Sequence, residues 1–250
     1  MIELKTASEL ELMRRAGRIV AALLKHLSAL VRPGIKTKAL DEAAMAYLKG
    51  AGGQPAFLGY RGFPACICVS VNEEVVHGIP GERKLREGDL VSIDAGVMVE
   101  GLYADAATTV GVGTVSSQAR RLAETTRQAL QAGIAQAKVG NRLTDISHAV
   151  QRVVEREGLG VVRDFVGHGI GHALHEDPPV PNFGPPHTGP RLTGGMVLAI
   201  EPMVTLGGPD VTILDDGWTA VTNDRSLAAH FEHTVAITEQ GPQVLTADGP

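Results

Sequence analysis

The amino-acid sequence predicts an α+β fold in which helices cover one side of a curved, mostly antiparallel sheet. Two stretches with helical periodicity are followed by strands, and this order occurs twice along the 250 residues. The two copies also resemble each other, because residues 34–41 align with 140–147 at an offset of 106, and 85–94 with 192–201 at an offset of 107. No linker separates them. We therefore expect a single domain over residues 1–250, with pseudo-two-fold halves at about 8–113 and 117–238.

The first half begins with two helices. Apolar residues such as Leu10 and Met13 recur at three- and four-residue spacings, which predicts a helix over residues 8–31. Ser8 and Glu11 have the spacing of a capping box, so the helix is expected to begin at Ser8. The other elements expected in this half are a helix at 37–49, a loop at 55–62, a strand at 63–71 and a turn with a short strand at 72–81.

Residues 90–105 have the pattern of a β-hairpin with one carboxylate on each arm. A turn centred on Val99 and Glu100 would place Asp94 directly opposite Asp105, with their β-carbons about 5 Å apart. Two carboxylates at that distance repel by roughly 3 kcal/mol at an effective dielectric near 20. The hairpin therefore suggests a metal site. The alternative is a register that differs by a residue or two and leaves one aspartate in solvent.

The second half supplies a similar pair of acids. Helices are expected at 116–138 and 141–157, followed from residue 161 by strands and glycine- or proline-rich loops. The internal alignment places Asp94 on Glu201 and Asp105 on Glu232, so four carboxylates would converge on the pseudo-axis. Their charge would be matched by two divalent cations, which in such sites lie about 3.5–4 Å apart and activate a bridging water for hydrolysis.

A histidine is the ligand type still missing from this set. Residues 167–176 offer His168, His172 and His175 in a glycine-rich stretch, and glycines on both sides of His168 would let the backbone lie close to a ligand. Spacing alone does not distinguish His168 from His172.

Composition limits the class of protein. The net charge is −5 and basic residues form no block, which argues against sequence-specific nucleic-acid binding. Cys66 and Cys68 are too few for a disulfide framework and are expected to be reduced. The N-terminus lacks the layout of a signal peptide, and no apolar run is long enough to span a membrane. We therefore expect no membrane association and a cytoplasmic location.

The motifs around these acids resemble those of a known enzyme family. Asp94 in Ser-Ile-Asp-Ala-Gly, Asp105 in Ala-Asp-Ala-Ala-Thr-Thr, His168 in Gly-His-Gly-Ile-Gly, Glu201 in Ala-Ile-Glu-Pro and Glu232 in Phe-Glu-His-Thr resemble the metallopeptidases of pita-bread (creatinase/aminopeptidase-like) fold. Asn72-Glu73 and His77-Gly78-Ile79-Pro80 narrow the resemblance to the type I methionine aminopeptidases of the bacterial form. The resemblance extends from about Thr6 to Thr238.

The resemblance implies a dinuclear metal centre of Mn²⁺, Fe²⁺ or Co²⁺. Asp94 and Asp105 would hold one ion, and His168 and Glu201 the second. Asp105 and Glu232 would bridge the two. A metal-bound hydroxide would attack the carbonyl that follows the first residue of the substrate, with Glu201 as general base.

The resemblance also implies roles around the substrate. His175 would hydrogen-bond the carbonyl oxygen as charge develops, and His77 would lie beside the scissile nitrogen. The pocket for the methionine side chain would be formed by Tyr60, Phe63, Cys68, His77 and Trp218. The partners would be the N-termini of nascent polypeptides, a role that suggests docking at the ribosome, and the protein is expected to be a monomer.

Two alternatives belong to different classes. An X-Pro aminopeptidase or dipeptidase of the same fold would share the metal ligands, although such enzymes usually carry a large extra N-terminal domain. A binding module that keeps the fold without catalysis would typically have lost metal ligands, whereas all five are present here. Release of methionine rather than of a residue before proline distinguishes the first, and any turnover excludes the second.

Overall fold

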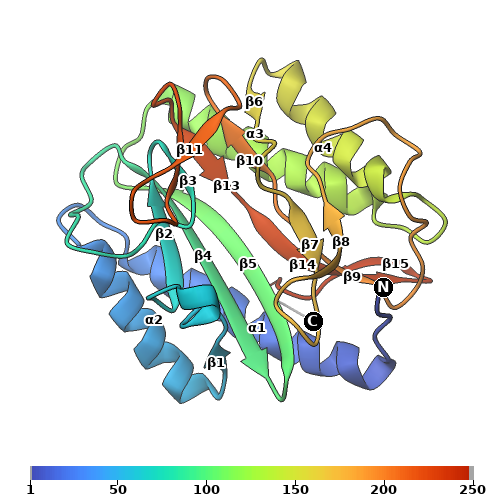
Figure 1. Cartoon of the computed structure of the whole chain (residues 1–250). Coiled ribbons are helices and arrows are strands. Elements are labelled where there is room, and N and C mark those ends of the chain that lie inside the picture. Colours follow the sequence, from blue (N-terminus) through green and yellow to red (C-terminus); the bar gives the residue numbers. More distant parts are fainter. Residues whose placement is uncertain (1, 248–250) are drawn as a thin grey trace.

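A computed structural model describes residues 2–247 of the chain and has the predicted α+β class (Figure 1). Its helices are α1 (Ala7–Leu30), α2 (Thr37–Ala51), α3 (Ser117–Gln136) and α4 (Leu143–Arg156), with a 3₁₀ turn η1 (Tyr60–Gly62). The strands of the first half are β1 (Gln54–Pro55), β2 (Ile67–Val71), β3 (Glu74–Val76), β4 (Leu90–Val99) and β5 (Leu102–Gly111). Those of the second half are β6 (Gly160–Val161), β7 (Gly167–Gly169), β8 (Glu176–Val180), β9 (Val197–Ile200), β10 (Met203–Thr205), β11 (Val211–Ile213), β12 (Ala220–Thr222), β13 (Ala228–His230), β14 (Glu232–Thr238) and β15 (Gly241–Val244).

One antiparallel sheet runs through both halves. Its strand order is β1-β4-β5-β14-β9-β7-β8, with β2 paired to β4 and β15 paired to β14. The two long strands of the first half are curved and cross the centre of Figure 1. Two smaller three-stranded sheets, β13-β10-β6 and β11-β12-β3, lie beside it. The halves therefore meet where β5 pairs with β14.

The helices pack against one face of this sheet. Val91, Ile93 and Ala95 of β4 lie in a buried cluster with residues of α1 and α2. Leu198 and Ile200 of β9 lie in a second cluster with residues of α3 and α4. Because side chains alternate across a strand, the residues between them project from the opposite face. No helix within residues 2–247 is long and apolar enough to cross a membrane.

The first helix begins earlier than the sequence predicted. The N-cap is Thr6, whose hydroxyl accepts from the Glu9 N–H at 3.3 Å while the Glu9 carboxylate accepts from the Thr6 N–H at 2.7 Å. The expected capping box of Ser8 and Glu11 is therefore wrong. Two overlapping pairs fit the same sequence pattern, and the backbone bond from Lys5 N–H to Gly195 O, 2.7 Å, fixes the chain just before the earlier one.

The two halves repeat the same backbone hydrogen bonds. Gly34 N–H donates to Leu85 O at 2.7 Å, and Gly140 N–H donates to Leu192 O at 3.0 Å. The two donors are 106 residues apart in the sequence and the two acceptors 107, which are the offsets found by internal alignment. Each bond ties the loop before the second helix of a half to the segment that precedes a central strand of the sheet, β4 in the first half and β9 in the second.

The central hairpin has a different register from the predicted one. Its turn residues are Glu100 and Gly101, which both have positive φ, at 52° and 85°. This conformation is unfavourable for β-branched Val99, and the turn therefore forms one residue later than predicted. Asp105 lies opposite Gly96, and Asp94 lies opposite Ala107. The two aspartates are thus diagonal neighbours, but a shift of two residues leaves both on the same face.

Two threonine hydroxyls complete the junction between the halves. The hydroxyl of Thr234 on β14 accepts from Asp105 N–H at 3.0 Å and donates to Asp105 O at 2.8 Å. The hydroxyl of Thr109 on β5 accepts from His230 N–H at 3.0 Å and donates to His230 O at 2.6 Å. The two exchanges are related by the pseudo-two-fold, since Asp105 corresponds to His230 and Thr109 to Thr234, in both cases 125 positions later.

This symmetry corrects one part of the internal alignment. Asp105 lies opposite Gly96, and its counterpart in the second half is the residue opposite Met203, which is His230 rather than Glu232. The predicted match of Asp105 with Glu232 is therefore wrong by two residues. The connection between paired strands is a two-residue turn in the first half but contains β11 and β12 in the second, so the offset changes along the chain.

Candidate active site

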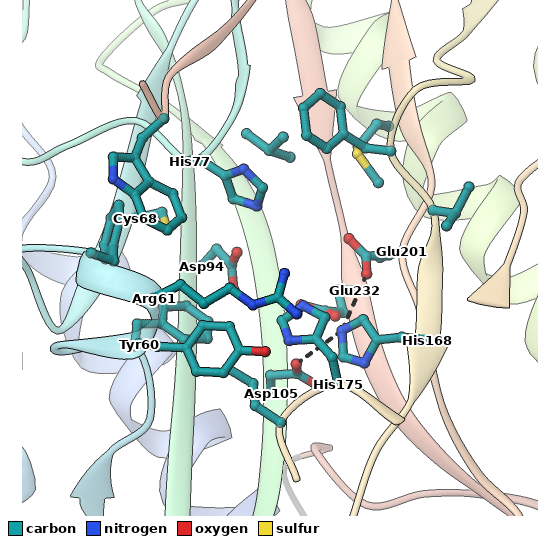
Figure 2. A pocket seen from close by; sticks show the side chains of 18 of the residues that line it. Tyr60, Arg61, Cys68, His77, Asp94, Asp105, His168, His175, Glu201 and Glu232 are labelled. Carbon is teal, nitrogen blue, oxygen red and sulfur yellow. Dashed lines mark ion pairs between the residues drawn. The ribbon is translucent and has the colours of Figure 1, made fainter. Parts of the chain in front are cut away.

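A cavity of ≈ 350 Å³ opens on the sheet face that the helices leave free (Figure 2). Every site residue predicted from the sequence lines it, although the residues come from both halves of the chain. Figure 2 shows Asp94 and Asp105 on the strands of the first half, facing His168, Glu201 and Glu232 of the second.

His168 lies at the centre of the acidic cluster. Its Nε2 atom is 3.5 Å from Asp105 Oδ2 and 3.5 Å from Glu201 Oε1. Its Nδ1 atom is 2.9 Å from the carbonyl oxygen of Gly169. A carbonyl can only accept, so Nδ1 carries the proton in the neutral ring and Nε2 presents a lone pair to the carboxylates. One ligand atom from each of Asp105, His168 and Glu232 lies within 4.8 Å of the others.

The glycines beside His168 are required by close backbone contacts. A β-carbon on Gly167 would lie 2.3 Å from the carbonyl oxygen of Ala199, and one on Gly169 would lie 2.1 Å from that of Asp177. Any side chain at either position would push β7 away from its neighbours and move the imidazole out of the cluster. The glycine pattern that favoured His168 in the sequence therefore has a direct structural basis.

The four carboxyl groups have little exposure to solvent. Asp105 and Glu232 are each 3% exposed. Burial raises the pKa of all four groups, and repulsion from neighbouring carboxylates adds to it for Asp94, Glu201 and Glu232. Asp94 Oδ1 is buried without a hydrogen-bond partner among residues 2–247. Buried acids with an unpaired oxygen and a free imidazole lone pair fit divalent cations, which replace the lost solvation.

Two further histidines line the cavity as neutral rings. Burial lowers the pKa of His175 to about 3 and that of His77 to about 4. The centroid of the His175 ring lies 4.1 Å from that of the His168 ring. The His175 ring also stacks on the Tyr60 ring, with the two centroids 5.2 Å apart. His77 has a φ of 61°, a strained conformation for a residue with a side chain and one that is common at functional sites.

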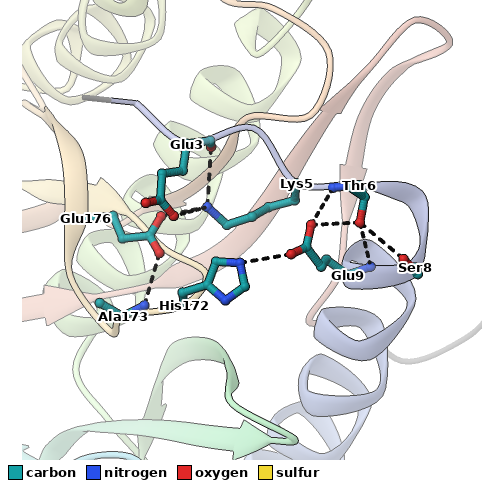
Figure 3. A network of polar contacts seen from close by, with 8 residues as sticks. All are labelled: Glu3, Lys5, Thr6, Ser8, Glu9, His172, Ala173 and Glu176. Atoms are coloured by element: carbon teal, nitrogen blue, oxygen red, sulfur yellow. Dashed lines mark hydrogen bonds and ion pairs between the residues drawn. The ribbon is translucent and has the colours of Figure 1, made fainter.

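The loop that carries His175 is anchored to the N-terminal segment (Figure 3). Lys5 Nζ donates to Glu176 Oε2 at 2.7 Å, and the Lys5 side chain is only 1% exposed. The other oxygen of Glu176 accepts from Ala173 N–H at 3.0 Å, which closes the loop. The buried ion pair therefore fixes the backbone on which His175 projects into the cavity.

The same network holds His172 outside the cavity, whereas His168 faces into it. His172 Nε2 lies 2.9 Å from Glu9 Oε1, at the start of α1, and the ring does not line the cavity. His168, in contrast, is 8% exposed and faces three of the acids. The ambiguity that spacing left open is thus removed by the direction of the two side chains.

An apolar pocket adjoins the acids. Phe63 and Trp218 meet edge to face with their centroids 5.1 Å apart, and Cys68 packs in the same buried cluster. Both cysteines are free and buried. Burial raises the pKa of the Cys68 thiol well above its ordinary value, so this residue contributes apolar surface rather than a reactive thiolate.

Sequence reasoning missed several cavity residues. Arg61 lies at the cavity mouth with its guanidinium 5.3 Å from the Tyr60 ring centre, and Asp164 and Phe165 line another wall. Arg61 lies in the short turn η1, and Asp164 and Phe165 lie in an irregular segment, so no periodicity marks any of them as a functional position. The left-handed backbone of Arg61, at a φ of 50°, is visible only in the structure.

The family model for metallopeptidase family M24 matches residues 11–239. The chain belongs to metallopeptidase family M24. Among curated relatives, "Methionine aminopeptidase" of Clostridium perfringens is 54% identical over 98% of this chain and 99% of its own length. "Methionine aminopeptidase 1" of Bacillus subtilis is 53% identical with the same coverage. The resemblance seen in the motifs is thereby confirmed.

Solved structures resemble this chain to different degrees. The crystal structure of methionine aminopeptidase from Thermotoga maritima matches with a TM-score of 0.98 at 48% identity, covering 99% of this chain and 100% of that one. The prolidase from Pyrococcus furiosus matches with a TM-score of 0.79 at 22% identity, and the match covers only 66% of its length. That second likeness concerns the fold alone. The predicted pita-bread fold is confirmed by both.

Proposed function

We propose that this M24 metallopeptidase removes the N-terminal methionine from polypeptides, with nascent chains as its substrates. The observation that carries the proposal is one cavity in which four carboxylates, two of them buried and two half-buried, and the His168 imidazole adjoin an apolar pocket. Two relatives that are more than half identical and match over nearly the full length bear the name of this activity. The proline-specific alternative is not favoured, because those proteins are similar in fold only and are longer.

The motif resemblance and the clustering of these side chains in one cavity support the choice of metal ligands. Asp94 and Asp105 would hold one divalent cation, and His168 and Glu201 would hold the other. Asp105 and Glu232 would be shared by the two. When bound, such a pair of ions activates a water molecule and polarises the substrate carbonyl. Oxygen ligands with one imidazole suit Mn²⁺ or Fe²⁺, with Co²⁺ as a further candidate.

The protein's own groups bind the peptide and move the protons. Glu201 takes the proton of the attacking water and passes it to the leaving amine as general acid. His175, a neutral ring, donates a hydrogen bond to the carbonyl oxygen as negative charge develops there. His77 lies beside the scissile nitrogen. The methionine side chain occupies the pocket formed by Tyr60, Phe63, Cys68, His77 and Trp218, where its sulfur meets aromatic rings.

The same proposal extends to the protein's setting. An enzyme that acts on nascent chains works close to the ribosome, in the cytoplasm. We expect it to act as a monomer, since the cavity is complete within one chain.

Peptide hydrolysis tests the proposed function. Purified protein supplied with Mn²⁺, Fe²⁺ or Co²⁺ should release methionine from Met-Ala-Ser and should not release alanine from Ala-Pro-Ser, as measured by chromatography of the free amino acids. His168→Ala should lose the activity, whereas His172→Ala, which changes an exposed histidine of the same loop, should retain it. Preferential cleavage of Ala-Pro-Ser would support the proline-specific alternative. No turnover by folded, metal-loaded protein would support a binding module.

A further inference from the structure

His230, the last residue of β13, is a buried histidine beside the proposed active site that none of the roles above uses. It is 1% exposed. Its Nε2 atom has no hydrogen-bond partner within the described part of the chain. That atom lies 3.5 Å from Glu201 Oε2. A buried polar nitrogen that faces a carboxylate without a formed hydrogen bond requires an explanation.

The pseudo-two-fold shows why a polar side chain occurs here. Asp105 lies opposite Gly96, two residues beyond Asp94 on β4. His230 lies opposite Met203, two residues beyond Glu201. His230 therefore has the position relative to Glu201 that Asp105 has relative to Asp94. In the first half this position holds a proposed metal ligand, and in the second it holds an imidazole that faces one.

The backbone of His230 is held as firmly as that of Asp105. The Thr109 hydroxyl bonds both its N–H and its carbonyl oxygen, at 3.0 Å and 2.6 Å. The imidazole is thus presented to Glu201 from a fixed strand. Such rigid support is what an outer hydrogen-bond partner of a metal ligand needs, because the partner must fix the orientation of the ligand.

The Glu201 carboxylate lies between two imidazoles. Oε1 is 3.5 Å from His168 Nε2, and Oε2 is 3.5 Å from His230 Nε2. His168 presents a lone pair on its side, because its proton is on Nδ1. The proton of a neutral imidazole is most stable on the nitrogen that faces a carboxylate, so His230 carries its proton on Nε2. Oε2 of Glu201 then faces the N–H of His230, and Oε1 faces the unprotonated Nε2 of His168. The space between Oε1 and that nitrogen can accept a cation.

We propose that His230 is a positioning residue for Glu201, to which its Nε2–H donates a hydrogen bond at Oε2. This bond directs Oε1 toward His168 and so keeps the carboxylate in the orientation needed to bind a cation and accept a proton. The inference rests on the proposed function for its catalytic consequence. Its consequence for metal binding can be measured without any peptide.

Two amide substitutions distinguish this role from simple packing. The side-chain nitrogen of glutamine can reach the place of histidine Nε2, whereas that of asparagine reaches only the place of Nδ1. His230→Gln should therefore keep Mn²⁺ affinity and kcat close to those of the parent. His230→Asn should lose about 10–100-fold in Mn²⁺ affinity, measured by calorimetry, and a similar factor in kcat with little change in KM. The visible spectrum of the Co²⁺-loaded Asn variant should also change.

The control is the same substitution on a neighbouring histidine. His233 Nδ1 contacts Thr246 Oγ1 at 2.9 Å and is not among the residues that line the cavity. His233→Asn should therefore leave Mn²⁺ affinity unchanged. Parental Mn²⁺ affinity in His230→Asn, or equal losses in His230→Gln and His230→Asn when both are folded, would overturn the inference. If no variant hydrolyses peptide but the affinities differ as expected, the proposed function fails and the positioning role stands.

A measurement on the unaltered protein covers the case in which the variants do not fold. Protein labelled with ¹⁵N-histidine and loaded with diamagnetic Zn²⁺ should show the His230 proton on Nε2 in its NMR spectrum. A proton on Nδ1 instead would overturn the inference, because Nε2 could then not donate to Glu201.

Discussion

Asp105→Asn should remove most of the protein's affinity for divalent cations and with it the release of methionine. The side chain is buried and offers Oδ2 toward His168, while Oδ1 lies 3.0 Å from the Thr234 hydroxyl, whose proton it shares with the Asp105 carbonyl oxygen. Asparagine preserves the shape but removes one of four negative charges and a proposed bridging ligand. Loss of an outer partner of a ligand already costs about 10–100-fold in metal affinity, so loss of the ligand itself should cost more. Mn²⁺ content after dialysis measures the effect.

Tyr60→Phe is the control for this variant, because it changes a cavity residue that is not a proposed ligand. It should retain its Mn²⁺. Comparable metal contents in the two variants would contradict the assignment of the site.

Asp105→Asn should stabilise the metal-free protein at pH 7, although it weakens metal binding. Burial raises the pKa of the Asp105 carboxyl above its ordinary 3.8. The stability that this group contributes is therefore present at pH values below 3.8 and is lost as the pH rises through the raised value. At pH 7 the metal-free Asn variant should thus unfold at a higher temperature than the metal-free parent.

Glu201→Gln should lower kcat by about 10²–10⁴-fold, the range expected when a general base is removed. The amide cannot accept the proton of the attacking water, although it keeps the volume of the side chain and an oxygen for the metal. KM for Met-Ala-Ser should change little, because the apolar pocket is untouched. Steady-state kinetics at saturating Mn²⁺ measure both constants. Glu9→Gln, which alters a half-buried glutamate at the start of α1 that does not line the cavity, should leave them unchanged. A kcat for Glu201→Gln near the parental value would exclude Glu201 as the base.

The sequence was sufficient to predict that Asp94 and Asp105 share one face of the sheet. Alternation along β4 requires that Asp94 point away from the residues on either side of it, Ile93 and Ala95, which pack against the helices. This conclusion survives the error in the hairpin register, because a shift of two residues preserves the face. The turn itself was misplaced since the left-handed conformation of Glu100 cannot be read from composition.

Other features depend on contacts between distant segments. The choice between His168 and His172 is made by Glu9, more than 160 positions earlier in the sequence, which no local pattern could indicate. The match of Asp105 with His230 is hidden because the connection between the paired strands is longer in the second half than in the first. Local pattern thus predicted the elements and the acids, whereas pairing between the halves determined their exact partners.

The central claim is that both halves contribute ligands to a single pair of divalent cations. Anomalous X-ray scattering from crystals grown with Mn²⁺ tests it most directly. We expect two peaks about 3.5–4 Å apart in the cavity. Asp105 and Glu232 should contact both ions, Asp94 one, and His168 with Glu201 the other. Peaks only at exposed acidic side chains, with none in the cavity, would contradict the account.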